Sequence, residues 1–491
     1  MKTIQNFIQI PFIQAVEEFY KGLNIPVNVL STLPTNAAAI LDNDSFNHLI
    51  EEVYPYGIIN DAIFEKENTF NNIEEVKTLK SDYEGILLFG ITLIPRENDL
   101  LPTRGQLAEI TRAVNKAFPF TPVNIIFKYD KYIALASTER MQYKQAWREG
   151  EKMGKVSLLR DIDCEMVHSG HIRILQNLEI TRSGKNAINN FDSLYKYWQD
   201  VLSVSILNKV FYRELQNWYF WAIKEVRFPD EPLQLDFDSL EKYDEALKEH
   251  KGKNVIRLLT RLLFIWFIKE KGLIPDEIFD EKEIAKHFID GFTPQKPEGM
   301  FADGKYSSKY YRAILQNLFF ATLNQPRNER EFRADGKHQN ATQLMRYKSY
   351  LKKPDYFIEL MESKVPFMNG GLFECLDKPH PTLKGPQGGD RIMYVDGFSD
   401  RPDNELVVPD FLFFDADEEI DLSAEYGNAK AKKEKTRGLF TILKSYKFTI
   451  TENTPIDEEV ALDPELLGKV FENLLASYNP ETKTTARKQT G

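Results

Sequence analysis

The sequence predicts an α/β or α+β N-terminal domain followed by a mostly α-helical domain. Tyr83 to Ile94 (YEGILLFGITLI) is an almost continuous apolar run typical of a buried strand, and apolar residues recur at helical spacing from Pro102 to Phe118. Two short β-prone runs follow, Val123 to Phe127 and Tyr132 to Ala136, and they predict a hairpin. Beyond residue 190 the chain changes to long apolar or amphipathic segments that are rich in aromatic residues.

The changes in hydrophobic pattern and composition along the chain predict its domain organisation. We expect an α/β domain over 1–180, a polar linker over 181–190 (TRSGKNAINN), a helical domain over 191–330, a loop-rich segment over 331–437 and a connector over 438–491. The helices of the second domain are predicted over Phe191–Val226, Asn254–Lys271 and Tyr310–Leu323. Gly272 and Pro275 give the second of these helices its C-terminal stop.

Composition narrows the class of protein. Hydrophobic residues make up 42% and charged residues 28% of the chain, as in ordinary soluble proteins. Cys164 and Cys375 cannot form a disulfide framework, and the N-terminus has no signal-peptide pattern, so we expect a cytoplasmic protein. The most apolar run, Leu258 to Ile268, is interrupted by Arg261 and is shorter than the ~20 residues of a membrane span. We therefore expect no membrane partner.

The net charge of −11 disfavours a chain that coats nucleic acid over its whole surface, but it leaves room for local basic surfaces. The clearest basic pattern lies on a helix predicted from Glu139 to Lys152, where four basic residues recur every four positions: Arg140, Lys144, Arg148 and Lys152. These residues are the predicted DNA-binding site, in contact with phosphates. The alternative is a solvated helix face paired with neighbouring glutamates. The run Lys430 to Arg437 (KAKKEKTR) is also basic, and we expect it to be mobile.

Two groups of residues have a spacing that metal sites use. Cys164, His168 and His171 could bind zinc, but no second ligand pair stands at the usual distance, which favours a local turn. Glu75-Val76-Lys77 matches the Glu-x-Lys of metal-dependent nucleases, yet it precedes the first clear strand. We therefore predict no metal site, and Mg²⁺ only if a nuclease is present.

Segments in the second half of the chain resemble one family. Val365 to Glu374 (VPFMNGGLFE) resembles the P-F-(L/M)-N-G-G-L-F-E segment of large restriction–modification adenine methyltransferases, the type IIG class and related phage-defence methylases. Leu462 to Leu475 is similar to the helix that precedes the methyltransferase domain in that family, and Phe264 to Leu273 is similar to one of its helix ends. Thr482 to Gly491 resembles the segment that runs into the cofactor motif T-G-x-F-Y-T-P. The resemblance covers residues 200–491, and residues 1–180 match nothing.

The resemblance implies the N-terminal part of an adenine-specific (N6) DNA methyltransferase, with double-stranded DNA and possible defence-system subunits as partners. Thr490 and Gly491 would begin its cofactor-binding motif for S-adenosylmethionine. The family's Asn-Pro-Pro motif is absent, because Asn479-Pro480 is followed by Glu481. We therefore expect the methyltransferase domain to be missing, and this chain alone neither to bind the cofactor nor to methylate. The alternatives are a metal-dependent endonuclease with a helical connector and a non-catalytic DNA- or partner-binding scaffold.

Overall fold

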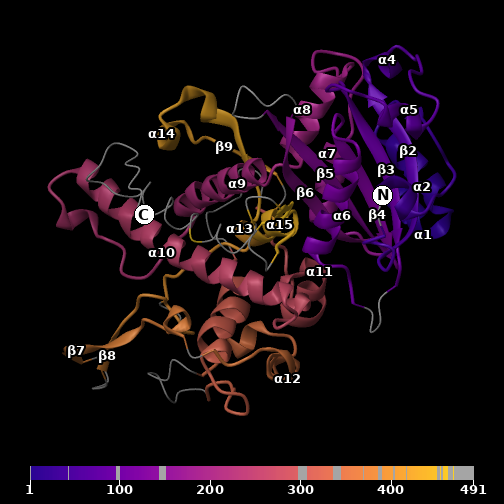
Figure 1. Ribbon diagram of the computed structural model, residues 1–491. Coiled ribbons are helices and arrows are strands. Elements are labelled where there is room, and N and C mark those ends of the chain that lie inside the picture. Colours follow the sequence, from indigo (N-terminus) through magenta and orange to yellow (C-terminus); the bar gives the residue numbers. More distant parts are fainter. Residues whose placement is uncertain are drawn as a thin grey trace. The chain divides into compact units, whose positions relative to one another are not determined.

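The computed structural model describes residues 2–41, 44–95, 100–142, 151–296, 307–334, 344–368, 370–384, 390–401, 404–415, 417–449, 454, 457–462 and 468. The chain forms two compact units, whose elements are labelled in Figure 1. Unit 1 comprises residues 1–210 and 444–466, and unit 2 comprises residues 211–443 and 467–491. The N-terminal part carries a mixed seven-stranded sheet with helices, and a largely helical region follows, so the predicted fold class is confirmed.

Unit 1 is built on a sheet whose strands lie in the order β1, β2, β3, β4, β5, β6 and β11. Their bounds are β1 (Asn28–Val29), β2 (Ile50–Asn60), β3 (Gly85–Leu93), β4 (Val123–Tyr129), β5 (Tyr132–Gln142), β6 (Glu151–Asp163) and β11 (Asp457–Glu459). β3 runs parallel to β4 and β6 runs parallel to β11, whereas the other neighbours are antiparallel. Parallel neighbours need a crossover connection, and helix α6 (Arg104–Ala117) supplies it between β3 and β4.

β3, α6 and the β4–β5 hairpin confirm the elements predicted for residues 83–136. Helix α6 begins after Thr103, whose hydroxyl accepts a hydrogen bond from the Gln106 amide at 3.2 Å. The Gln106 side chain accepts in return from the Thr103 amide at 2.9 Å, which completes a capping box. The hairpin turns at Asp130, whose φ of 50° lies in the left-handed region that aspartate tolerates.

Both faces of the sheet are covered by helices. One core cluster combines the sheet with α1 (Lys2–Gln9), α2 (Phe12–Gly22), α7 (Ser169–Asn177) and α8 (Phe191–Val201), and the other combines it with α3 (Ala37–Leu41) and α6. In β3, Ile86 and Leu88 belong to the first cluster, whereas Leu87 and Phe89 belong to the second. Burial on both faces explains why residues 83–94 show no polar alternation.

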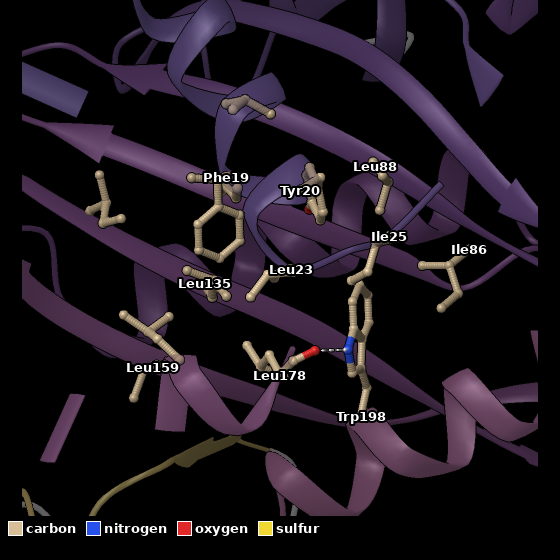
Figure 2. Packing of buried hydrophobic residues seen from close by; sticks show 14 of the residues in the cluster. Phe19, Tyr20, Leu23, Ile25, Ile86, Leu88, Leu135, Leu159, Leu178 and Trp198 are labelled. Carbon is tan, nitrogen blue, oxygen red and sulfur yellow. Dashed lines mark hydrogen bonds between the residues drawn. The ribbon is translucent and has the colours of Figure 1, made fainter. Parts of the chain in front are cut away.

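Residues 181–190 contain neither helix nor strand. The core nevertheless continues across them, because Leu178 before this stretch and Leu194 and Trp198 after it belong to the same cluster. Figure 2 shows the indole of Trp198 donating to the Leu178 carbonyl, over 3.2 Å. Helix α8 therefore packs within unit 1, which continues to Val210.

The predicted helical segments agree with the structure in part: residues 191–226 hold two helices, α8 and α9 (Val204–Glu225), and α10 (Leu240–Glu270) begins ahead of the predicted start at Asn254. Helix α9 begins in unit 1 and ends in unit 2. Ser239 caps α10 by accepting from the Lys242 amide, and the helix ends before Gly272, whose φ is +72°. Residues 310–323 include two π-helical stretches, η5 (Tyr311–Gln316) and η6 (Phe319–Leu323). No helix in the described part of the chain is long and apolar enough to cross a membrane.

Shorter elements complete the described fold. Unit 1 also holds α4 (Asp61–Phe64) and α5 (Ile73–Lys77). Unit 2 holds η2 (Gln234–Asp236), η3 (Asp276–Phe279), α11 (Glu281–Glu283), η4 (Ile284–Phe288), η7 (Lys348–Tyr350), α12 (Pro354–Lys364), η8 (Gly371–Phe373), α13 (Phe411–Phe414), α14 (Ser423–Tyr426) and η9 (Ala429–Lys433). Its strands form two ladders, β7 (Lys378–Lys384) with β8 (Asp390–Met393) and β9 (Glu418–Ile420) with β10 (Glu434–Thr436). Helix α15 (Leu439–Lys444) leads back to unit 1.

Aromatic rings form much of the core of unit 2. Phe440 stacks on Trp266 with ring centroids 5.7 Å apart, and it meets Phe279 edge-on at 5.1 Å. Tyr310 and Phe414 also meet edge-on, at 4.8 Å. Each such pair contributes about 0.5–1.5 kcal/mol beyond the area it buries. The aromatic enrichment seen after residue 190 therefore serves core packing.

Candidate functional site

The segment Val365–Glu374, which carries the family-like motif, directly follows helix α12. Val365 is fully buried and Phe373 is 2% exposed, so the segment is anchored in the core near both ends. Between these anchors Phe367 and Met368 are 43% and 38% exposed. The Met368 amide donates to the carbonyl of Leu323, the last residue of η6, at 2.8 Å. The structure thus presents two adjacent large apolar side chains on a fixed backbone.

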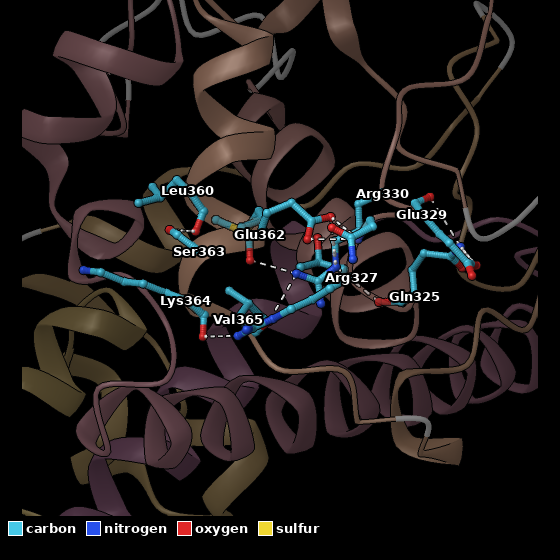
Figure 3. Close-up of polar contacts among 12 residues, drawn as sticks. Gln325, Arg327, Glu329, Arg330, Leu360, Glu362, Ser363, Lys364 and Val365 are labelled. Carbon is cyan, nitrogen blue, oxygen red and sulfur yellow. Dashed lines mark hydrogen bonds and ion pairs between the residues drawn. The ribbon is translucent and has the colours of Figure 1, made fainter.

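Two arginines hold the start of this segment (Figure 3). Arg330 Nη1 donates to the carbonyls of Met361 (2.8 Å) and Val365 (3.1 Å). Arg327 donates to the carbonyls of Val365 (3.2 Å) and Lys364 (3.3 Å). The last carbonyls of a helix lack intrahelical partners and carry partial negative charge, so cations stabilise them. The end of α12 is therefore fixed by two positive side chains.

Arg261 of α10 holds the far end of the segment. Its Nε donates to the Leu372 carbonyl at 2.8 Å and its Nη2 to the Glu374 carbonyl at 3.1 Å. Its Nη1 donates to the Asp396 carboxylate at 2.8 Å, and the guanidinium lies 4.9 Å from the ring centre of Phe320. Arg261, which interrupts the apolar run of α10, thus positions the far end of the motif.

A second carboxylate fixes the backbone around Asp396. Asp377, which is 7% exposed, accepts hydrogen bonds from four consecutive amides, those of Val395 (2.7 Å), Asp396 (2.8 Å), Gly397 (3.2 Å) and Phe398 (2.7 Å). Gly397 has a φ of +62°, and a Cβ there would lie 2.8 Å from Pro229 Cγ. Only glycine fits this turn without strain.

The π-helical region adds side-chain amides to the same network. Gln316 Nε2 donates to the Asp396 carbonyl at 2.8 Å. Asn317, between η5 and η6, pairs with the backbone of Arg346: its Nδ2 donates to the carbonyl and its Oδ1 accepts from the amide, both at 2.8 Å. Gln316 and Asn317 are fully buried, so these bonds satisfy polar groups that would otherwise be costly.

The buried hydrogen-bond network around Arg261, Asp377 and Asp396 holds the backbone of the segment in place. Burial raises the pKa of the Cys375 thiol, and the carboxylates of Asp377 and Asp396 raise it further, so the sulfur stays protonated and is a poor nucleophile. Within the described ranges, no three His, Cys, Asp or Glu side chains are placed to hold a metal ion. The arrangement can position the Phe367–Met368 pair, and it brings together no acid–base or nucleophilic constellation among the described residues.

The helix predicted over residues 139–152 is wrong where the structure describes it. Arg140 lies in β5 and Lys152 in β6, and these strands pair antiparallel with Arg140 opposite Met153. Lys144 and Arg148 lie outside the described residues. Pairing of residues 132–142 with 151–163 in the sheet overrides the local helical pattern, and a strand repeats every two residues rather than every four. DNA contact by these four residues stays a prediction.

Two basic residues further along β6 have acidic partners. Lys155 forms an ion pair with Glu458, which belongs to β11. Arg160 contacts Asp161 at 2.9 Å and Glu459 of β11 at 3.7 Å. Strand β11 therefore brings carboxylates to the positive charge of β6.

The residues with metal-like spacing have local structural roles. His168 caps α7 by accepting from the Gly170 amide at 3.0 Å. Burial lowers the pKa of His171 to about 3 and raises that of the Cys164 thiol to about 12. Glu75 and Lys77 lie on helix α5, whereas the Glu-x-Lys of a nuclease lies on a strand. Their order and placement do not match a nuclease site.

The C-terminal segments that carry part of the resemblance fall largely outside the described residues. Of the helix predicted within Leu462–Leu475, only Leu462 and Gly468 are described, and Gly468 is helical. Thr490 and Gly491, predicted to begin a cofactor motif, also lie outside the described residues. Their role stays a prediction.

Comparison with known proteins gives one distant relation. The chain is 24% identical over 231 residues, 46% of its length, to "Putative type II restriction enzyme and methyltransferase RM.MjaORFECS2P" of Methanocaldococcus jannaschii. The match spans 12% of that protein, so the chain corresponds to a small part of the relative. No protein-family model matches the chain, and no solved structure matches it. The chain is thus distantly related to a restriction–modification protein.

Proposed function

We propose that this chain is the N-terminal part of an adenine-specific (N6) DNA methyltransferase of a bacterial restriction–modification or phage-defence system, in which it supplies DNA contacts and a scaffold. The relation to the restriction and modification protein carries the proposal, because it extends over 46% of the chain. The Val365–Glu374 segment supports it, because its sequence resembles a segment of that family; buried arginines hold its carbonyls in place.

The cofactor of the proposed longer protein is S-adenosylmethionine, which supplies the methyl group. Adenine must be flipped out of the duplex to meet that methyl group. The sequence of this chain has no Asn-Pro-Pro motif to hold the adenine amino group. We infer, from the resemblance of residues 482–491, that Thr490 and Gly491 belong to the cofactor motif and that the catalytic Asn-Pro-Pro motif lies outside the 491 residues of this chain.

DNA binding is the first test of the proposal. The 491-residue chain, titrated into fluorescently labelled duplex DNA and followed by anisotropy, should bind without turnover. Affinity should fall as salt rises from about 50 to 200 mM, because each phosphate contact releases condensed counterions. Charge reversal of Lys144 and Arg148 should weaken binding if the residues predicted from sequence contact phosphates. Absence of binding at low salt would contradict the proposal.

The gene itself supplies the second test. The reading frame after the codon for Gly491 should continue with Phe-Tyr-Thr-Pro and, further on, Asn-Pro-Pro-Phe or Asn-Pro-Pro-Tyr. Calorimetric titration of the 491-residue chain with S-adenosylmethionine should show no heat of binding. A frame without these motifs, or saturable cofactor binding by this chain, would overturn the assignment of the catalytic domain.

A further inference from the structure

The basic run Lys430–Arg437 was expected to be mobile, and the structure instead gives it defined elements. Residues 429–433 form the turn η9, and residues 434–436 form strand β10, which pairs antiparallel with β9. The Leu422 amide donates to the Ala431 carbonyl at 2.9 Å, and Leu422 is fully buried. The run is therefore tied to unit 2 by backbone bonds at both its turn and its strand.

The side chains of this run fall into two sets. The inner set is buried or paired with α9, and the outer set is exposed. Ala431 and Thr436 are 2% and 4% exposed. The carboxylate of Glu434 accepts from Arg213 at 2.8 Å and from Asn217 at 3.1 Å, both on α9. Arg437 pairs with Glu214 at 3.1 Å. Glu434 and Arg437 are thus both bound to side chains of α9.

The outer set consists of the four lysines of the run, Lys430, Lys432, Lys433 and Lys435, which we call the lysine platform. All four are exposed. Lys433 lies 3.8 Å from Glu419, a residue that also sits opposite Lys435 across the β9–β10 ladder. Among the residues that the structure describes, no carboxylate lies within 4.0 Å of the other three ammonium groups. Four positive charges therefore face solvent, and only that of Lys433 has so close a described carboxylate.

The residues beneath the platform are paired with one another. Arg213 lies over the ring of Tyr426 at 3.8 Å, and the Tyr426 hydroxyl donates to Asn217 Oδ1 at 2.7 Å. Lys224 pairs with Glu425 at 3.1 Å. The cations beneath the platform thus have local partners. On the platform itself, the charge of Lys432 acts on the carboxylate of Asp421 and Lys433 lies near Glu419, whereas Lys430 and Lys435 have no described carboxylate within 4.0 Å.

We propose that the lysine platform binds the phosphate backbone of duplex DNA. The inference rests on the proposed function and names a contact surface for it. Lysine ammonium groups act as point charges toward phosphate and confer affinity without sequence preference. In a chain of net charge −11, four exposed lysines within six residues offset part of the repulsion of a polyanion.

The composition of the platform favours DNA over a membrane or a protein partner. Membrane-surface segments combine basic residues with exposed apolar side chains, and protein interfaces are depleted in lysine and enriched in aromatic residues. None of the exposed large hydrophobic residues in the described chain falls between positions 418 and 437. The platform offers charge without an apolar contact area.

The test replaces all four platform lysines with glutamine in the 491-residue chain (K430Q, K432Q, K433Q and K435Q). Anisotropy with labelled duplex DNA should show at least about tenfold weaker binding at low salt, and a logarithmic salt slope smaller by about 0.9 for each phosphate that the variant no longer neutralises. The same positions changed to arginine should retain binding, because the charge is kept. A matched control changes four exposed lysines elsewhere in unit 2, Lys242, Lys248, Lys253 and Lys271, to glutamine and should bind like wild type.

The results distinguish a failure of the platform proposal from a failure of the proposed function. If wild type and the platform variant bind DNA equally with the same salt slope, the platform inference is wrong while DNA binding stands. If wild type binds no DNA at low salt, both are wrong. Binding of wild type to phosphatidylserine vesicles, abolished in the platform variant while DNA binding is unchanged, would identify a membrane surface instead. Unchanged melting temperatures would show that every variant is folded.

Discussion

Arg261 and Asp396 form a buried ion pair 135 residues apart in sequence, with Nη1 and Oδ1 2.8 Å apart and side chains 3% and 5% exposed. Arg261 also binds two carbonyls of the Val365–Glu374 segment, and the backbone of Asp396 binds Asp377 and Gln316. The pair therefore joins helix α10, the family-like segment and the turn at Gly397.

Removing one partner of this pair should destabilise unit 2 strongly. We expect Asp396→Ala to lower the free energy of unfolding by about 3–5 kcal/mol, because it leaves a buried guanidinium without its counter-charge. The double variant Arg261→Met, Asp396→Ala should recover part of the loss. Arg227→Ala is the control, since its pair with Glu405 is exposed and contributes about 0–1 kcal/mol. Chemical denaturation measures all four proteins, and equal losses for Asp396→Ala and the control would refute the role assigned to the pair.

Trp198 should be essential to unit 1 although it lies beyond residues 181–190. Truncating this 3% exposed side chain to alanine should cost about 3–5 kcal/mol, whereas Lys196→Ala on the exposed side of α8 should change stability by less than about 0.5 kcal/mol. For the same reason, a proteolytic cut within 181–190 should leave the two pieces associated on gel filtration. Separation of a folded piece ending near residue 180 would show instead that 181–190 is an interdomain linker.

Acid should destabilise unit 1 through His171. Burial, with Lys447 and His168 nearby, lowers the pKa of His171 to about 3 in the folded state, against about 6.5 when unfolded. The stabilising contribution is present above pH 6.5 and is lost as pH falls toward 3, by up to about 1.4 kcal/mol per pH unit. His171→Leu should flatten this dependence, and His48→Leu at an exposed position should not. Melting temperatures across this range provide the measurement.

Unit 2 should respond to pH in the opposite direction through Asp410. Burial raises the pKa of Asp410 to about 7, even though its carboxylate accepts from Ser307 Oγ at 2.5 Å and from the Tyr310 amide at 3.0 Å. The contribution is fully present below about pH 3.9 and is lost as pH rises through 7. Asp410→Asn should remove this dependence. Asp238→Asn, at a 93% exposed side chain, is the control, and a pH response unaffected by Asp410→Asn would count against the assignment.

The sequence predicted those elements whose signal is local. β3, α6 and the end of α10 followed from an apolar run, a helical repeat and a terminating glycine. The helix expected over 139–152 is wrong at its described ends, because residues 139–142 and 151–152 lie in the paired strands β5 and β6, and local spacing does not reveal that pairing. Arg261 was visible as an interruption of an apolar run, but nothing in the spacing of the chain links it to Asp396. The basic run 430–437 was visible in the sequence as charge, but only its contacts with α9 show which of its side chains are buried or paired and which are exposed.

The parallel pairing of β11 with β6 has a consequence for the order in which the chain is made. About 300 residues, including nearly all of unit 2, separate Leu158 from its partner Glu459. At 5–20 residues per second, a ribosome takes roughly 15–60 s to synthesise them. During that time β6 is an open sheet edge, a template for pairing with other chains. Most of the sheet of unit 1 is therefore made about 300 residues before the strand that covers its β6 edge, and the nascent chain with β6 unpaired is the stage at which a chaperone would protect the sheet.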